Sequence, residues 1–311
     1  ASLAADIQVL CTRKYLFNRG VSTCPVHRNP PRADAETLQH DRSCDPSPCS
    51  ICRMTDTRDC DEPLKGFGVD IGGSGIKAAT VDLRTGDLIG DRDKILTPQP
   101  STPDAVAEVV RQLADNAEWD GPIGITVPAV VRDQVTRSAA NIDSAWIGTD
   151  VQELFSRHLD GRKVSVLNDA DAAGIAETTY GAEEAKSGPV ILLTFGTGIG
   201  SAMLIDGELY PNSELGHLPY GATTAEKWAS SAVKEREDLS YKEWAKRVNG
   251  VMLSYEALFS PQTFIVGGGI SRKADKWIPH LDLNASVVPA TFRNQAGIIG
   301  AALAVYSGLQ P

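Results

Sequence analysis

The stretch "GVDIGGSGIK" at residues 68–77 places glycines directly after an aspartate that ends a short apolar run. Glycine weakens a strand unless the backbone must turn sharply or approach another group closely. A glycine-rich loop after a strand also exposes backbone N–H groups, which can bind phosphate oxygens. The stretch therefore indicates either a tight turn or a phosphate-binding loop, and the rest of the chain must decide between them.

The same pattern recurs in the second half of the chain. "DIGGSGIKAATVD" (70–82) aligns with "TFGTGIGSAMLID" (194–206), and each copy joins an apolar strand, a glycine turn and a second apolar strand. A third glycine cluster ends the apolar run in "TFIVGGGIS" (263–271). The sequence has no GxxxxGK[ST] loop, and no GxGxxG opens a helix. The repeated loops favour a phosphate chain that is bound from two sides.

Apolar periodicity and turn residues predict the order β-β-β-α-β for the first part of the body, with strands at 67–71, 77–83, 88–95 and 122–130. Thr102 and Pro103 are typical of a helix start between the third and fourth strands. The duplication predicts two related α/β domains with a glycine turn from each facing the cleft between them. We expect these domains at 66–167 and 168–311, with a terminal helix at about 295–307 that packs back toward the first.

The composition is that of an ordinary soluble protein. The chain has 311 residues, of which 42% are hydrophobic and 23% charged, enough for one large or two medium domains. No apolar run approaches the ~18 residues of a membrane span, and no secretory signal is visible. The net charge of −10 argues against binding to nucleic acid or to an anionic membrane surface.

All six cysteines lie in the first 60 residues, at positions Cys11, Cys24, Cys44, Cys49, Cys52 and Cys60. This part is rich in proline and arginine and has no sustained helical or strand period. We expect residues 1–65 to be a flexible appendage, with a metal site or a disulfide-linked knot as the alternatives. The cysteine-free remainder is typical of the reducing cytoplasm, which is the predicted location.

The ordered set of motifs resembles the sugar-kinase, Hsp70 and actin superfamily. The first phosphate motif of that superfamily has its counterpart at Asp70 with Gly72–Gly75, and the second at "TFGTGIGS" (194–201). The adenosine motif corresponds to "VGGGIS" (266–271). The two connecting helices correspond to "NDADAAGIAE" (168–177) and "GIIGAALA" (297–304). The resemblance covers about residues 66–311. It implies the α/β fold class of two actin-like (RNase H-like) βββαβα domains with an interdomain cleft.

Within that superfamily, "PNSELGHLPY" (211–220) followed by Glu226 is similar to the sugar site of the bacterial ROK kinases. The amino-acid sequence around the second and third glycine motifs is most similar to that of the polyphosphate glucokinases, including polyphosphate/ATP-using glucomannokinases. Typical ROK proteins follow the Gly-His pair with a zinc-binding cysteine cluster. Residues 216–230 contain no cysteine, so we expect no structural zinc and do not assign His217 as a zinc ligand.

The resemblance implies an enzyme that transfers the terminal phosphoryl group of inorganic polyphosphate or ATP to the 6-hydroxyl of glucose and also of mannose, with Mg²⁺ as cofactor. A hydroxyl group is a weak nucleophile that needs a general base. Asp169 in "LNDAD" is the predicted base, and a helix cap is its structural alternative. Asp171 is expected to be a carboxylate at the start of the same helix.

The remaining site residues follow from the resemblance. The predicted sugar ligands are Asn141, Asn168, Asp169, Glu214, His217 and Glu226. The predicted phosphate contacts are Gly72, Gly73, Ser74, Gly75, Lys77, Thr197, Gly198, Gly268 and Gly269. Asp70 is expected to hold Mg²⁺ through water. The structural alternatives are an ordinary turn for Asn141, backbone bonding for His217, a solvated surface for Glu226 and Lys77, and a turn cap for Asp70.

Cations that could guide a polyphosphate chain are Arg272, Lys273 and Lys276 after the third glycine cluster, Arg132 and Arg137 in a hairpin, and Lys186. Each could equally be a solvated surface charge. The competing functions are a strictly ATP-dependent ROK hexokinase for another sugar and a ROK-type transcriptional regulator. A regulator requires a winged helix-turn-helix ahead of residue 66, where paired amphipathic helices are not visible. The "NDAD" and "ELGH" motifs argue against an actin-like filament protein, and the sequence predicts no oligomeric state.

Overall fold

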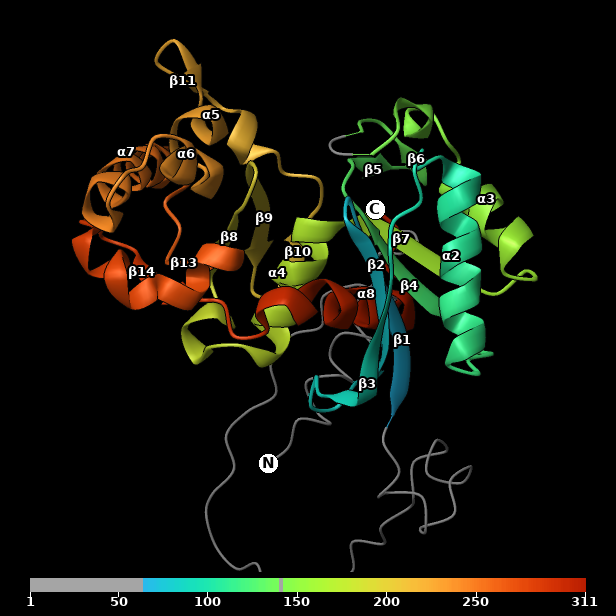
Figure 1. Cartoon of the computed structure of the whole chain (residues 1–311). Helices are drawn as coiled ribbons and strands as arrows, with labels where there is room; N and C mark the ends of the chain where they lie inside the picture. Colours follow the sequence, from blue (N-terminus) through green and yellow to red (C-terminus); the bar gives the residue numbers. More distant parts are fainter. Residues whose placement is uncertain (1–63, 140–141) are drawn as a thin grey trace, which may run out of the picture. The chain divides into compact units, whose positions relative to one another are not determined.

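The computed structural model describes residues 64–139 and 142–311 (Figure 1). Nearly all of the predicted appendage, with its six cysteines, therefore lies outside the described residues. So does Asn141, one of the predicted sugar ligands. Among the residues that are described, no helix combines the length and apolar character needed to cross a membrane.

Two five-stranded sheets are built on one plan. The first has the order β3-β2-β1-β4-β7 and the second the order β10-β9-β8-β13-β14. In each sheet three antiparallel strands are followed by two parallel ones. The strands of the first sheet are β1 (Lys65–Gly72), β2 (Gly75–Asp82), β3 (Leu88–Ile95), β4 (Ile123–Val127) and β7 (Val164–Asn168). Those of the second are β8 (Pro189–Phe195), β9 (Ile199–Ile205), β10 (Glu208–Tyr210), β13 (Thr263–Gly267) and β14 (Ser286–Pro289). The predicted fold class is confirmed in this duplication, and the domain boundary at residues 167 and 168 stays a prediction.

Seven α-helices connect or cover the described strands, together with two short hairpins. The helices are α2 (Pro103–Asn116), α3 (Val151–His158), α4 (Asp169–Tyr180), α5 (Ala225–Ala229), α6 (Ser231–Arg236), α7 (Tyr241–Phe259) and α8 (Ala296–Ser307). The hairpins are β5 (Val131–Arg132) with β6 (Val135–Thr136), and β11 (Pro219–Tyr220) with β12 (Thr223–Thr224). Thr102 caps α2 through its extended backbone alone, whereas Ser240 and Glu243 form a reciprocal capping box at α7.

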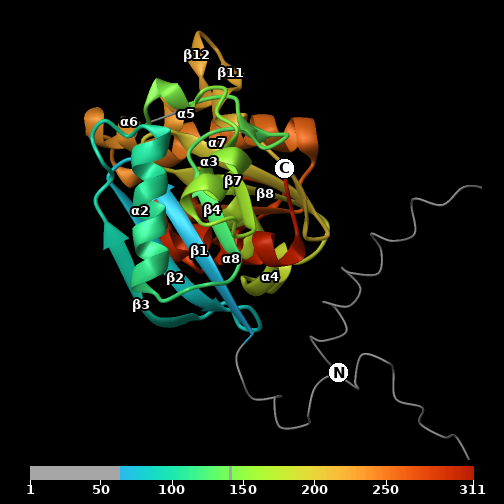
Figure 2. The same ribbon diagram turned by 90° about the vertical axis from the view of Figure 1, so that its right-hand side faces the viewer.

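The side-chain period of two in each strand distributes the apolar residues between the layers. Ile191, Leu193 and Phe195 of β8 pack with the α7 residues Trp244 and Val248 on one face of the second sheet. The alternate residues of β8 pack with α4 and α8 on its other face. Helices α2 and α3 cover the face of the first sheet opposite α8, as the two views in Figures 1 and 2 agree. Helices α4 and α8 thus form the central layer between the sheets.

The backbone of helix α8 in the central layer lies directly against the backbone of neighbouring strands, which the glycines and alanines at the contact permit. A Cβ atom added to Gly124 of β4 would lie 1.8 Å from the carbonyl oxygen of Ala301 in α8. One added to Gly68 of β1 would lie 1.9 Å from the oxygen of Ile298. Helix α8 therefore sits on β1 and β4 with no room for a side chain between them.

The two glycine turns differ by one residue. Gly72 pairs with Gly75, so Gly73 and Ser74 form a two-residue hairpin loop between β1 and β2. In the second copy Phe195 pairs with Ile199, so three residues, 196–198, connect β8 and β9. The aligned repeat therefore predicts the strands of both copies correctly. The pairing between the two strands differs by one residue from one copy to the other.

The packing of α8 on the first sheet predicts that Gly124→Ala lowers the free energy of unfolding by about 3 kcal/mol, because the new methyl group must displace helix backbone and not a flexible side chain. Urea denaturation measures this. Gly269→Ala is the matched control, since its added Cβ would meet no atom of residues 64–139 and 142–311 within 4 Å. Equal stability of the two variants would contradict the close approach of α8 to β4.

Candidate active site

The first turn of α4 carries the central group of the site. Asn168 ends β7, and its side-chain Oδ1 accepts hydrogen bonds from the backbone N–H groups of Ala170 (2.8 Å) and Asp171 (3.3 Å). Its Nδ2 donates to the carbonyl oxygen of Ala129 in the loop after β4 (3.2 Å). Asn168 is therefore the cap of α4, and one Nδ2 hydrogen is left to donate to a sugar hydroxyl. Asp169, whose structural alternative was this cap, is the first residue of the helix.

The carboxyl group of Asp169 has a raised pKa. The residue is accessible to water, yet enough protein surrounds its carboxyl group that loss of hydration is the largest contribution to its pKa. The negative charge of Asp70 is the next contribution, and that of Glu214 adds a smaller one, opposed by the Ala170 N–H group, which donates to Oδ1. Together these effects raise the pKa of Asp169 to about 6. A base with its pKa near the working pH is suited to accepting a proton from a hydroxyl group.

Asp70 lies opposite Lys77 on the neighbouring strand, because the two-residue turn sets that register. The Lys77 Nζ donates to Asp70 Oδ2 at 3.0 Å, and Thr126 Oγ1 donates to Asp70 Oδ1 at 3.1 Å. Lys77 was predicted to contact phosphate or to face solvent. In the structure it is a half-buried partner of Asp70, beside the exposed Gly73–Ser74 turn.

The second and third glycine loops meet one another. Gly268 follows β13 with φ of +83°, a left-handed conformation suited to glycine, and a Cβ there would lie 2.3 Å from the Phe195 carbonyl oxygen. The Gly196 carbonyl oxygen accepts from the N–H of Ala232 in α6 (3.1 Å). Thr197 and Gly269 are exposed beside them. Two of the three predicted phosphate loops are thus brought together at the ends of adjacent strands β8 and β13.

Glu214, His217 and Glu226, three of the predicted sugar ligands, form one cluster. The His217 ring lies between the two carboxylates, with Nδ1 3.6 Å from Glu214 Oε2 and Nε2 3.7 Å from Glu226 Oε1. A Cβ on Gly198 would lie 2.4 Å from Glu226 Oε2, so the second glycine turn and this cluster are neighbours. Burial raises the pKa of Glu214, an effect that His217 opposes and Glu226 reinforces.

Asp171 and Asn212 are the functional candidates that the sequence did not predict. Asp171 was expected only as a carboxylate at the helix start, and it does lie in the first turn of α4. Its side chain, however, is fully buried, and Oδ2 accepts from the backbone N–H of Asn212 at 2.7 Å. Burial raises the pKa of Asp171 to about 7, with Asp169 and Glu214 adding to the rise. The available signal was the i, i+2 spacing in "NDAD", which directs the two carboxylates to different sides of a helix.

The residues at Asp70 suit a magnesium ion bound through water. Mg²⁺ usually keeps several waters and uses one or two carboxylates together with substrate phosphates. Both Asp70 oxygens already accept one protein hydrogen bond, and each has a further lone pair for a water molecule. Within the described part of the chain, no group of three or more His, Cys, Asp or Glu side chains is arranged to hold a metal ion.

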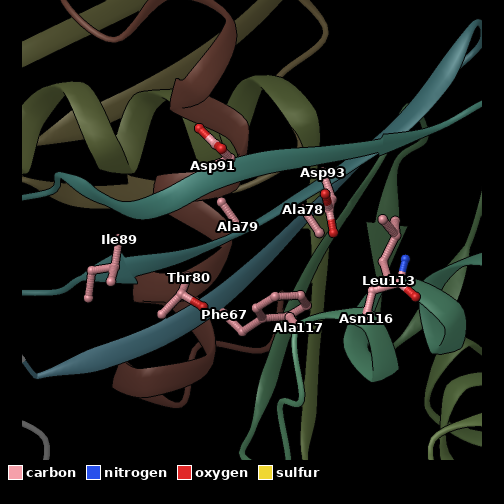
Figure 3. A pocket seen from close by; sticks show the side chains of 10 residues that line it. All are labelled: Phe67, Ala78, Ala79, Thr80, Ile89, Asp91, Asp93, Leu113, Asn116 and Ala117. Carbon is pink, nitrogen blue, oxygen red and sulfur yellow. The ribbon is translucent and has the colours of Figure 1, made fainter.

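A separate hollow of about 250 Å³ lies between β2, β3 and the C-terminal end of α2 (Figure 3). Of the predicted site residues that the structure describes, none lines this hollow. Asp91 and Asp93 contribute carboxylates to its wall, Leu113 and Asn116 come from the helix, and Ala117 is the residue that caps its C-terminal end. Two carboxylates disfavour a polyanionic phosphoryl donor, so this hollow is not a second phosphate site.

Comparison with known proteins assigns the chain to one class. Residues 66–227 match the ROK family. The chain is 55% identical over 239 residues to a polyphosphate glucokinase of Mycobacterium tuberculosis (strain CDC 1551 / Oshkosh), covering 77% of this chain and 90% of that protein. It is 50% identical over 250 residues to the polyphosphate glucokinase of Mycobacterium leprae (strain TN), covering 80% and 77%.

The structure agrees with the sequence comparisons. The crystal structure of inorganic polyphosphate/ATP-glucomannokinase from Arthrobacter sp. strain KM superimposes with a TM-score of 0.73 at 46% identity, over 78% of this chain and 98% of that one. The fold is that of the actin-like ATPases. The chain belongs to the ROK family, and the predicted resemblance is confirmed.

The electrostatics of the site predict that Asp169 titrates near pH 6, well above the usual range of an aspartate, because the surrounding protein reduces the hydration of its carboxylate and the negative charge of Asp70 adds to the effect. Carboxyl ¹³C NMR titration of the free protein measures this pKa. Removal of the neighbouring charge in Asp70→Asn should lower it. An Asp169 pKa near 4 in the wild-type protein, unchanged in Asp70→Asn, would be the contrary result.

Proposed function

We propose that this protein transfers the terminal phosphoryl group of inorganic polyphosphate or ATP to the 6-hydroxyl of glucose. The observation that carries the proposal is the position of Asp169. The negative charges of Asp70, in the first phosphate motif, and of Glu214, a predicted sugar ligand, both raise the pKa of its carboxyl group. The polyphosphate glucokinases and the glucomannokinase to which the chain is similar support this choice of donor and acceptor. A ROK-type regulator is not favoured by these relatives.

In the proposed reaction Asp169 accepts the proton of the sugar 6-hydroxyl, and the oxygen of that hydroxyl attacks the terminal phosphorus of the donor. The new O–P bond forms as the bridging P–O bond of the donor breaks, which leaves ADP or a polyphosphate shortened by one unit. The sugar hydroxyls bind Glu214, His217, Glu226 and the remaining Asn168 hydrogen. Asn141 stays a predicted sugar ligand outside the described residues.

The donor phosphates bind the backbone N–H groups of the three glycine loops. Phosphoryl transfer depends mainly on positioning and on neutralisation of phosphate charge. We propose that Asp70 holds Mg²⁺ through water, and the ion, when bound, supplies that neutralisation. The Lys77 ammonium, 3.0 Å from Asp70, keeps this carboxylate oriented beside the Gly73–Ser74 turn.

The proposed path of the polyphosphate tail is the exposed group Arg272, Lys273 and Lys276 after Gly269. Lys276 Nζ lies 5.5 Å from the ring centre of Tyr241, and Lys234 Nζ lies 4.4 Å from it, so cations from two elements converge there. Lys186, a further candidate, is already paired with Glu183 at 2.5 Å. The proposal also includes mannose as a second acceptor.

A phosphorylation assay that crosses ATP and polyphosphate with glucose, mannose and N-acetylglucosamine tests this function. We expect hexose 6-phosphate from glucose with both donors. The KM for polyphosphate should rise steeply with salt, because screening acts on exposed charges over about 8–10 Å. Absence of any product from polyphosphate would favour the ATP-dependent hexokinase, and absence of product from glucose would overturn the proposal.

The assignment of Asp169 predicts that Asp169→Asn lowers kcat by about 10²- to 10⁴-fold, the range for loss of a positioned general base. Glucose binding, measured by calorimetry, should persist, because the amide keeps the shape and most hydrogen-bonding capacity of the carboxyl group. Asp160→Asn, at an exposed position outside the site, is the control. A kcat close to that of wild type in Asp169→Asn would remove Asp169 from the role.

A further inference from the structure

The side chain of Asn212 joins the segment that carries Glu214 to the first half of the protein. Its Oδ1 accepts from the backbone N–H of Val131 at 2.8 Å, and its Nδ2 donates to the Val131 carbonyl oxygen at 2.7 Å. Val131 begins β5, in the hairpin that follows β4 of the first sheet (Figure 1). The Asn212 amide thus pairs with one residue of β5 as a peptide group of a neighbouring strand would.

Asparagine suits this position for two reasons. A primary amide has a donor and an acceptor side by side, which matches the N–H and C=O of one strand residue. In addition, Asn212 has φ of +61°, in the left-handed region that asparagine tolerates better than most residues. A side chain without the amide loses both bonds to Val131, and a bulky branched side chain also strains the backbone.

Asp171 holds the backbone of the same residue. Its Oδ2 accepts from the Asn212 N–H at 2.7 Å, and the side chain is completely buried. Its other oxygen, Oδ1, is buried with no hydrogen-bond partner among the described residues. A buried carboxyl oxygen without a partner is destabilising. Such a cost is usual where a residue is retained for function.

The segment after Asn212 is fixed at a second point. The Oγ of Ser201 in β9 donates to the Ser213 carbonyl oxygen (2.7 Å) and accepts from the N–H of Leu215 (2.9 Å). These two hydrogen bonds hold Ser213 and Leu215, the residues immediately before and after Glu214. The backbone of Glu214 is therefore held between the tether at Asn212 and the β9 contact at Ser201.

We infer that Asn212 and Asp171 are positioning residues, which set the sugar ligand Glu214 against the base Asp169 by tying residues 212–215 to α4 and to β5. The inference rests on the proposed function for its substrate. Asp169 and Asp171 lie two residues apart on one helical turn. One carboxylate faces the reacting hydroxyl, and the other holds the backbone two residues before Glu214. The same turn of helix fixes both sides of the sugar site.

Loss of the Asn212 side chain should act on the sugar and spare the donor, because its hydrogen bonds among the described residues go to Val131 and not to the glycine loops. In Asn212→Gly, which accepts the left-handed backbone, the KM for glucose should rise about tenfold to hundredfold, while the KM for ATP stays within about twofold of wild type. In Asn212→Asp the carboxylate keeps the bond to the Val131 N–H and repels its carbonyl oxygen, so we expect the same selective rise.

Hydrogen-exchange mass spectrometry supplies a readout that needs no activity. Peptides containing Val131 should exchange faster in Asn212→Gly than in wild type, because the Val131 N–H loses its acceptor. Asp238→Gly is the matched control, since Asp238 is also left-handed, with φ of +48°, and is exposed at the end of α6. It should leave both Michaelis constants and the Val131 exchange unchanged.

Unchanged exchange at Val131 in both Asn212 variants would overturn the tether itself. Faster exchange with an unchanged glucose KM, or with equal rises in both Michaelis constants, would overturn the positioning role. A wild-type enzyme that phosphorylates no glucose would overturn the proposed function and with it the assigned substrate, while the exchange measurement would still decide whether the tether exists.

Discussion

The raised pKa values of two carboxyl groups on one turn of α4 are the constraint on which the site depends. Asp171 is completely buried, whereas Asp169 is accessible to water but closely surrounded by protein, and loss of hydration is the first cause of the raised pKa of each. Such groups are stable only where other parts of the protein supply partners. Asn168 caps the turn, Ala170 N–H bonds Asp169, and Asn212 N–H bonds Asp171. The partners come from the helix and from a segment more than forty residues away in sequence.

Helix α4 can present this turn reproducibly because it is packed against α8 without intervening side chains. A Cβ on Gly300 would lie 1.8 Å from the carbonyl oxygen of Ala172. Further along α4, Glu177 accepts hydrogen bonds from the N–H groups of Thr291 and Phe292, both at 2.8 Å, just before α8 begins. The central layer therefore connects the two sheets rigidly at the carboxylates. The two sheets that this layer joins carry the glycine turns between β1 and β2 and between β8 and β9.

Much of this arrangement could be predicted from sequence, because local signals determine it. The apolar periods gave the strands and helices, and the repeated glycine loops predicted the duplication. Ser240 with Glu243 formed the capping box that such a pattern favours, while Thr102 made no side-chain cap bond. The ion pair of Asp70 with Lys77 follows once the turn is known to have two residues, yet glycine-rich sequence does not specify turn length. The partnership of Asp171, Asn212 and Val131 depends on tertiary packing among distant segments, and periodicity carries no signal for it.

The central claim is that phosphoryl transfer requires an ionised Asp169 whose pKa is raised by its surroundings. A single-turnover measurement with enzyme in excess over radiolabelled ATP and saturating glucose, quenched on the millisecond scale from pH 5 to 8, isolates the chemical step. The rate should fall as pH decreases, with a midpoint near 6, because protonated Asp169 cannot accept the hydroxyl proton. A rate that stays constant down to pH 5 would contradict it.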